Sequence, residues 1–266
     1  MLDREWAVKK VLFVLAMMTV FSILLIILLV AKESVPSLIK AGPLNLFFSS
    51  EWNPAQGKYG TLIFLAGTLL TTLGALITGV PLALGTAVFL TQMAPKKAGS
   101  VVARGVELLA GIPSIVLGWL GFTLLVPIIA RLTGSSGTGI LAASLILGVM
   151  IMPTVTTSMD ALEAVPASYR QASFGLGATR WQTIRHVTLP AAKRGIMVAV
   201  ILGMARAIGE TMAVALVIGP ATAFPKSLTT PTHTLTTKVL MEMGESIGVQ
   251  RSALFSMSLL LLALSM

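Results

Sequence analysis

Residues 61–92 read TLIFLAGTLLTTLGALITGVPLALGTAVFLTQ and contain no charged side chain. As an α-helix, a run of this length rises about 48 Å, which exceeds the ~30 Å hydrocarbon core of a bilayer. Pro81 lies inside the run and lacks a backbone N–H, so we expect a kink or a break there. A run this long and this apolar predicts a membrane-spanning helix.

Five more apolar runs occur along the chain of 266 residues, at 11–31, 108–129, 139–158, 195–219 and 252–266. Charged residues make up only 11% of the chain, whereas soluble domains carry about 25%. The sequence therefore predicts an all-α integral membrane protein with six transmembrane helices in one domain, 1–266. Because the last run is shorter than the ~20 residues that cross a bilayer, we expect the natural chain to continue past Met266.

Several classes of site are excluded by residue type. The chain has no cysteine, which excludes disulfides, thiolate metal sites and cysteine nucleophiles. Its two histidines, His186 and His233, have no second histidine one helical turn away, so we expect no metal-binding helix. The only Gly-Lys pair is followed by Tyr59, so the phosphate-binding loop of ATPases is missing. The chain is therefore not expected to be an enzyme or to hold a cofactor.

The net charge of +9 comes from basic residues between the apolar runs and not from a basic patch interleaved with aromatic residues. We therefore expect the lipid bilayer and an anionic solute as partners, and no nucleic acid. With the N-terminus inside, the inner segments hold eleven Lys and Arg residues and the outer segments seven. This excess follows the positive-inside rule and predicts a cytoplasmic N-terminus.

The connection at 159–194 is the longest inner segment and holds five of those eleven basic residues. Pro166 opens a stretch without proline, 167–187, that is predicted to be helical, and Pro190 closes it. Long ordered connections are usually functional. We therefore expect this loop to have a functional role.

Arg206 and Glu210 lie within the fifth apolar run, at a spacing that puts both side chains on one face of a helix. Arg206 is about 17 Å along the helix from the start of the run, near the bilayer midplane. One charged residue there costs about 2.5–3.5 kcal/mol. The pair is either an inert ion pair or a polar face that lines a solute path, and the cost favours the path.

A second interruption is predicted in the third run, where Gly111, Pro113 and Ser114 fall close together. Glycine and proline free backbone groups, which a membrane protein tolerates only where the segment is buried or faces a cavity. This segment is therefore a second candidate part of the path.

The long inner loop resembles the EAA loop of ABC-importer permeases. Glu-Ala-Ala, three residues, Gly, nine residues, Ile, one residue and Pro recur in that loop, and here Gln171, Ala172, Gly177 and Pro190 stand at the matching positions. Two residue types depart from the pattern, Gln171 in place of glutamate and Ser173 in place of the second alanine.

Three further segments, at 110–114, 176–181 and 206–214, resemble the permeases of Pst-type phosphate importers. Such permeases come as two related subunits. The sequence Thr-Met-Ala-Val at 211–214 resembles the C-type subunit more than the A-type subunit.

This resemblance implies the fold of a type I ABC-importer permease in the cytoplasmic (inner) membrane of a prokaryote. The partners would be a sister permease subunit, two ATPase subunits that carry ATP and Mg, and an extracytoplasmic phosphate-binding protein. The chain would move phosphate by alternating access, with ATPase contacts at Gln171, Ala172, Gly177 and Pro190. Arg206 would offer a cationic waypoint, and Glu210 would hold it in place. The remaining path residues would be Thr211, Pro113 and Ser114.

Three alternatives stay open. The same class of importer would serve another oxyanion, such as molybdate or sulfate. A secondary transporter would use Glu210 as a proton relay, which leaves the EAA-like loop without a role. A scaffold or assembly protein would need neither Arg206 nor Glu210.

Overall fold

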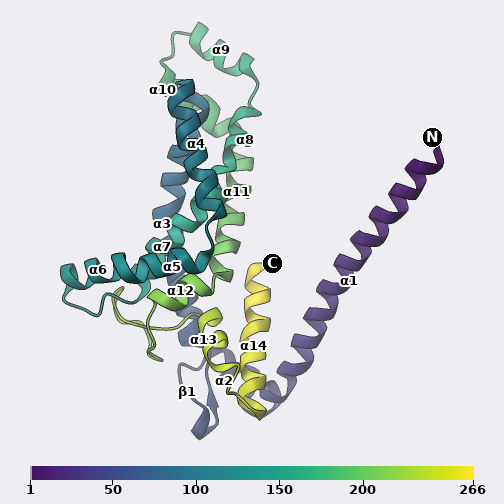
Figure 1. Ribbon diagram of the computed structural model, residues 1–266, viewed down its shortest axis with the longest axis vertical. Coiled ribbons are helices and arrows are strands. Elements are labelled where there is room, and N and C mark those ends of the chain that lie inside the picture. The colour runs from purple at the N-terminus through teal and green to yellow at the C-terminus, as the bar shows by residue number, and fades with distance from the viewer. Residues whose placement is uncertain (1) are drawn as a thin grey trace. The chain divides into compact units, whose positions relative to one another are not determined.

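The computed structural model describes residues 2–266 and is mainly helical (Figure 1). The long helices are α1 (Leu2–Ala41), α3 (Leu62–Val88), α4 (Lys96–Gly111), α7 (Ile140–Thr156), α11 (Leu189–Gly209) and α14 (Gly248–Ser265). The shorter ones are α2 (Pro43–Phe48), α5 (Ser114–Leu120), α6 (Val126–Thr133), α8 (Ser158–Glu163), α9 (Ala167–Gly175), α10 (Arg180–Thr183), α12 (Met212–Val217) and α13 (Leu235–Glu242). Strands β1 (Trp52–Asn53) and β2 (Lys58–Tyr59) form an antiparallel hairpin around a 3-10 turn, Pro54–Gln56.

Among residues 2–266, six helical segments are long and apolar enough to cross a membrane, as the sequence predicts. They are Val8–Ala41, Leu62–Met93, Ser114–Thr133, Ile140–Glu163, Arg180–Gly209 and Gly248–Ser265. Three contain π-helical turns, at Phe89–Met93, Gly121–Leu125 and Ile184–Thr188. The helix through Pro81 continues without a break, because a span in lipid has no water to compete for its backbone groups.

The contacts divide the chain into two compact units. The first holds the residues up to Leu62 together with Lys238–Leu264. Its helices α1 and α14 are joined by serine hydroxyls. Ser252 Oγ donates to the carbonyl of Glu33 at 2.7 Å and accepts from the Ser37 N–H at 2.9 Å. Hydroxyl groups join helices in this way where lipid offers no other partner.

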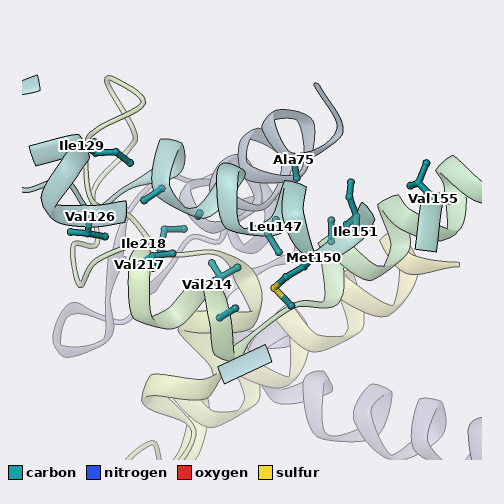
Figure 2. Close-up of a cluster of buried hydrophobic side chains, with 14 of the residues drawn as sticks. Ala75, Val126, Ile129, Leu147, Met150, Ile151, Val155, Val214, Val217 and Ile218 are labelled. Carbon is teal, nitrogen blue, oxygen red and sulfur yellow. The ribbon is translucent and has the colours of Figure 1, made fainter. Parts of the chain in front are cut away.

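The second unit, Ile63–Thr237, contains the main apolar core and both candidate sites. Helix α7 lies at the centre of this unit. In the span that contains α7, 61% of the residues are buried, whereas the figure is 22% in each of the spans that contain α3 and α11. Figure 2 shows Leu147, Ile151 and Val155 of α7 beside residues of α3, α6 and α12. Gly203 brings α11 against α7, because a Cβ there would lie 2.6 Å from Val155 Cγ2.

The helix that follows the inner loop begins earlier than the sequence predicts. The fifth candidate span begins at Arg180, and Pro190 lies in the first turn of α11 instead of closing a loop helix. A helix of 30 residues rises about 45 Å, so its basic turns extend beyond the ~30 Å apolar core without ending the helix. The preceding π turn, in which the Leu189 N–H bonds to the Ile184 carbonyl, leads into Pro190 without a break.

Candidate substrate path and coupling surface

The fifth apolar run is not one helix, which corrects the prediction from the sequence. Helix α11 ends at Gly209, and Glu210 has an extended backbone, with φ −70° and ψ 128°. The chain then continues into α12. One of the first N–H groups of that helix, that of Ala213, donates a hydrogen bond to Glu210 Oε1 at 3.3 Å. A carboxylate before a helix start is stabilised by those exposed N–H groups.

Arg206 and Glu210 therefore do not form the expected pair. Within the described residues, no ion pair joins them, and the Arg206 guanidinium donates to Thr154 Oγ1 of α7 at 3.3 Å. Arg206 lies in the last turn of α11 and is exposed on the surface of this chain. The carbonyl end of the helix favours a cation at that point. The result is a positive charge that no carboxylate of the described chain neutralises.

A group of buried threonines, which was not among the predicted site residues, forms a hydrogen bond to the backbone at the helix break. Thr236 Oγ1 donates to the carbonyl of Glu210 at 3.0 Å, which satisfies a group that the break removes from the helix. The Thr236 Oγ1 atom in turn lies 2.9 Å from Thr234 Oγ1. The signal was present as Thr-His-Thr-Leu-Thr-Thr at 232–237, a polar run between apolar segments.

The same threonine segment is anchored to α3. The Leu235 N–H donates to Thr68 Oγ1 at 2.9 Å, and the His233 ring packs edge-on to Phe64 with ring centroids 6.4 Å apart. Gly67 allows this approach, because a Cβ there would collide with the His233 carbonyl. The helix break is thus held by a segment that is itself fixed to the core.

The second predicted interruption is confirmed. Helix α4 ends at Gly111, Ile112 and Pro113 are extended, and α5 starts at Ser114. Helix α5 then packs against α12, since a Cβ on Gly118 would lie 2.6 Å from Ala213 Cα. In Figure 1, α5 and α12 both lie across the direction of α4 and α11. Pro113 with Ser114 and Glu210 with Thr211 therefore begin two helices that contact each other.

On the opposite side of the span formed by α7 and α8, the EAA-like loop forms a helix, a turn and a helix. Gln171 and Ala172 are exposed on α9, and Gly177 occupies the turn with φ +82°, a conformation that favours glycine. Thr179 then starts α10 with a reciprocal capping box to Gln182. Pro190 belongs to the next helix, so three of the four predicted coupling residues lie together.

Ser173, which departs from the family pattern, has a structural role. Its hydroxyl lies 2.9 Å from Thr183 Oγ1, which joins α9 to α10 across the turn. The outer surface of this helix pair carries large apolar side chains, and Leu176 is 89% exposed at its tip. Tyr169, Phe174 and Trp181 are also exposed there. An exposed apolar surface outside the spans is typical of a site for another protein.

Comparison with known proteins assigns this architecture. Residues 79–266 match the family model described as the binding-protein-dependent transport system inner membrane component. A probable ABC transporter permease protein, YqgH of Bacillus subtilis, is 45% identical over 84% of this chain and 74% of its own length. The phosphate transport system permease protein PstC of Pasteurella multocida is 36% identical over 82% of this chain and 74% of its own length.

The fold is also that of a solved importer. A chain of the MetNI methionine ABC transporter, in inward-facing conformations, superposes with a TM-score of 0.60 over 81% of this chain and 93% of its own. Its sequence identity of 21% supports the fold alone. The family match agrees with the expected lack of catalysis, because ABC permeases are not catalytic components. This chain therefore belongs to the family of binding-protein-dependent transport system inner membrane components, as a multi-pass permease subunit of an ABC importer.

Proposed function

We propose that this chain forms part of the path through which an ABC importer takes up inorganic phosphate. The observation that carries the proposal is the Arg206 guanidinium, which lies at a helix break within a membrane span and has no carboxylate partner among the described residues. A guanidinium binds phosphate oxygens through two parallel N–H groups. Such a charge within a membrane is costly unless it faces protein, water or a solute.

The position of Glu210 supports this role in a way the sequence did not suggest. Because its carboxylate accepts from the Ala213 N–H, it does not neutralise Arg206. Glu210 still places a negative charge four residues after Arg206 in the sequence, and this charge limits how tightly an anion is held. A transport site must release its ligand, so weak and reversible binding is an advantage.

The relatives support phosphate as the solute. The chain shares 36% and 34% identity with proteins named as phosphate transport permeases PstC from Pasteurella multocida and Haemophilus influenzae. The partners in this proposal are a sister permease, two ATPase subunits that bind ATP and Mg, and an extracytoplasmic phosphate-binding protein. The exposed helix pair α9–α10 is the surface for the ATPase.

The direct test is solute uptake by the assembled importer in proteoliposomes that contain ATP. We expect ATP-dependent uptake of labelled phosphate that excess unlabelled phosphate suppresses and that equal concentrations of sulfate or molybdate leave unchanged. Uptake of sulfate or molybdate in preference to phosphate would assign the importer to that oxyanion instead.

A further inference from the structure

A polar cavity lies beside the EAA-like loop in the Ile63–Thr237 unit, away from the helix break. Its volume is about 300 Å³, at the lower end of the range for small-molecule sites. Its polar lining is Thr91 and Gln92 at the end of the second span, Arg170 of α9, and Arg180 and Thr183 of α10, and Phe174 and Ile184 complete the wall. The end of the second span and the helix pair α9–α10, which are distant in sequence, therefore meet around one polar space.

Within the part of the chain that the structure describes, the two arginines of this cavity have no anionic partner. Among the side chains that the structure describes, the ion pairs are Lys58 with Glu51 and Lys238 with Glu242. Arg170 is half-buried and Arg180 is exposed, and no described hydrogen bond engages either guanidinium. Two cations that share a cavity repel each other unless an anion lies between them. The cavity therefore favours an anion.

The surrounding charge has the same sign. Segments 94–113 and 159–194 together hold eight Lys and Arg residues against three acidic ones, Glu107, Asp160 and Glu163. None of these three lines the cavity. Gln92 adds an amide that donates to Thr91 Oγ1 at 3.2 Å and keeps a second N–H for another acceptor. The donor set matches a tetrahedral oxyanion, since each guanidinium offers parallel N–H groups to two oxygens.

We propose that this cavity binds free inorganic phosphate as a second site, distinct from the Arg206 path. The choice of phosphate over another oxyanion rests on the proposed function, whereas the existence of an anion site does not. The bound anion bridges α9 to the end of the second span and to α10. It therefore links the end of the second span to the helix pair that is proposed to contact the ATPase.

The test measures phosphate binding and does not depend on transport. The permease–ATPase complex, without the extracytoplasmic binding protein, is placed in lipid nanodiscs with Arg206→Gln to remove the path site. Equilibrium binding of radiolabelled phosphate should still show one site. Adding Arg170→Gln and Arg180→Gln should raise its Kd roughly tenfold or more, because two charge-assisted contacts are lost.

The matched control is Arg185→Gln, which removes an exposed arginine of the same segment that does not line the cavity. Its Kd should stay within about twofold of the Arg206→Gln background. If the two substitutions together prevent assembly, the phosphate Kd of the Arg180→Gln variant alone tests the site and should still be raised. Arg180 is exposed and makes no described hydrogen bond or ion pair, so we expect this variant to fold.

Three outcomes would overturn the proposal. One is the absence of phosphate binding in the Arg206→Gln complex. Another is binding that survives both cavity substitutions. A third is that Arg170→Gln and Arg180→Gln release the ATPase while phosphate binding is absent, which would assign the cavity to a carboxylate of the ATPase. A failure of phosphate uptake in the intact importer would instead count against the proposed function and leave the binding result standing.

Discussion

The carbonyl of Glu210 and the hydroxyl of Thr236 form the contact that fixes the helix break, at 3.0 Å. Thr236→Val keeps the shape of the side chain but leaves that carbonyl without a partner, which costs about 1–3 kcal/mol. We expect a lower unfolding temperature of the purified complex and slower uptake per complex. Thr236→Ser keeps the hydroxyl and should restore both. Unchanged stability and uptake in Thr236→Val would show that the contact is dispensable.

Gly118 sets the distance between α5 and α12. In an open helix position, glycine to alanine stabilises by up to about 1 kcal/mol. At Gly118 the added Cβ would lie 2.6 Å from Ala213 Cα, so we expect Gly118→Ala to destabilise the protein by about 1–3 kcal/mol instead. Gly105→Ala in α4, where a Cβ meets no atom within 4 Å, is the control. Thermal unfolding of the two variants should shift in opposite directions, and a parallel shift would contradict this packing.

At the scale of elements, the α9–α10 turn depends on Gly177. No atom lies within 4 Å of a Cβ at this position, but its φ of +82° costs other residues about 1–2 kcal/mol. We expect Gly177→Leu to lower the phosphate transported per ATP hydrolysed while the protein still inserts. Gly175→Leu, which also has open space but an ordinary φ, should have the smaller effect. Equal coupling ratios in the two variants would remove the turn from the coupling mechanism.

Gln171 offers a second test of the α9–α10 helix pair, through the charge of its side chain. It is exposed on α9, and it stands where the related loops have glutamate. We expect Gln171→Glu to be tolerated, with uptake and ATPase co-purification within about twofold of the unmodified importer. A loss of ATPase binding in this variant would mean that the partner requires a neutral side chain there.

The whole chain lacks cysteine, so single cysteines report its orientation. Exposed Ser136 and Ser168 lie on opposite sides of the span Ile140–Glu163. A cytoplasmic N-terminus, as the basic residues predict, places residue 136 outside and residue 168 inside. A membrane-impermeant maleimide should then label Ser136→Cys in intact right-side-out vesicles and Ser168→Cys only after permeabilisation. The reverse pattern would invert the predicted orientation.

The six spans could be predicted because each is long and nearly free of charge, so composition alone identifies it. The start of the fifth span could not, since Arg180 and its neighbours belong to a helix that extends beyond the apolar core. Charge marks the edge of the membrane and does not mark the end of a helix. The turn at Gly177 divides the stretch 167–187, which is predicted to be helical, because glycine adopts the left-handed conformation there.

The candidate site was predictable only in part. Arg206, Pro113 and Ser114 were found because a charge or a Gly-Pro pair within a span is costly. The break at Glu210 was missed because no proline marks it and its carbonyl is satisfied by Thr236, which is 26 residues further along the chain. A contact between distant segments leaves no periodic signal in either of them. For the same reason, the loss of the expected Arg206–Glu210 pair could not be anticipated.

In the proposed path the Arg206 guanidinium, which has no carboxylate partner among the described residues, guides phosphate through the membrane, and initial uptake rates test this role directly. The assembled importer is reconstituted with ATP, and uptake is divided by the amount of complex that contains the ATPase. Arg206→Gln should lower the rate about ten- to a hundredfold, and Arg206→Lys should recover only part of it, because an ammonium lacks the planar fork. Glu210→Gln should cause a smaller loss. Near-normal phosphate uptake by the fully assembled Arg206→Gln importer would contradict a role of Arg206 in the phosphate path.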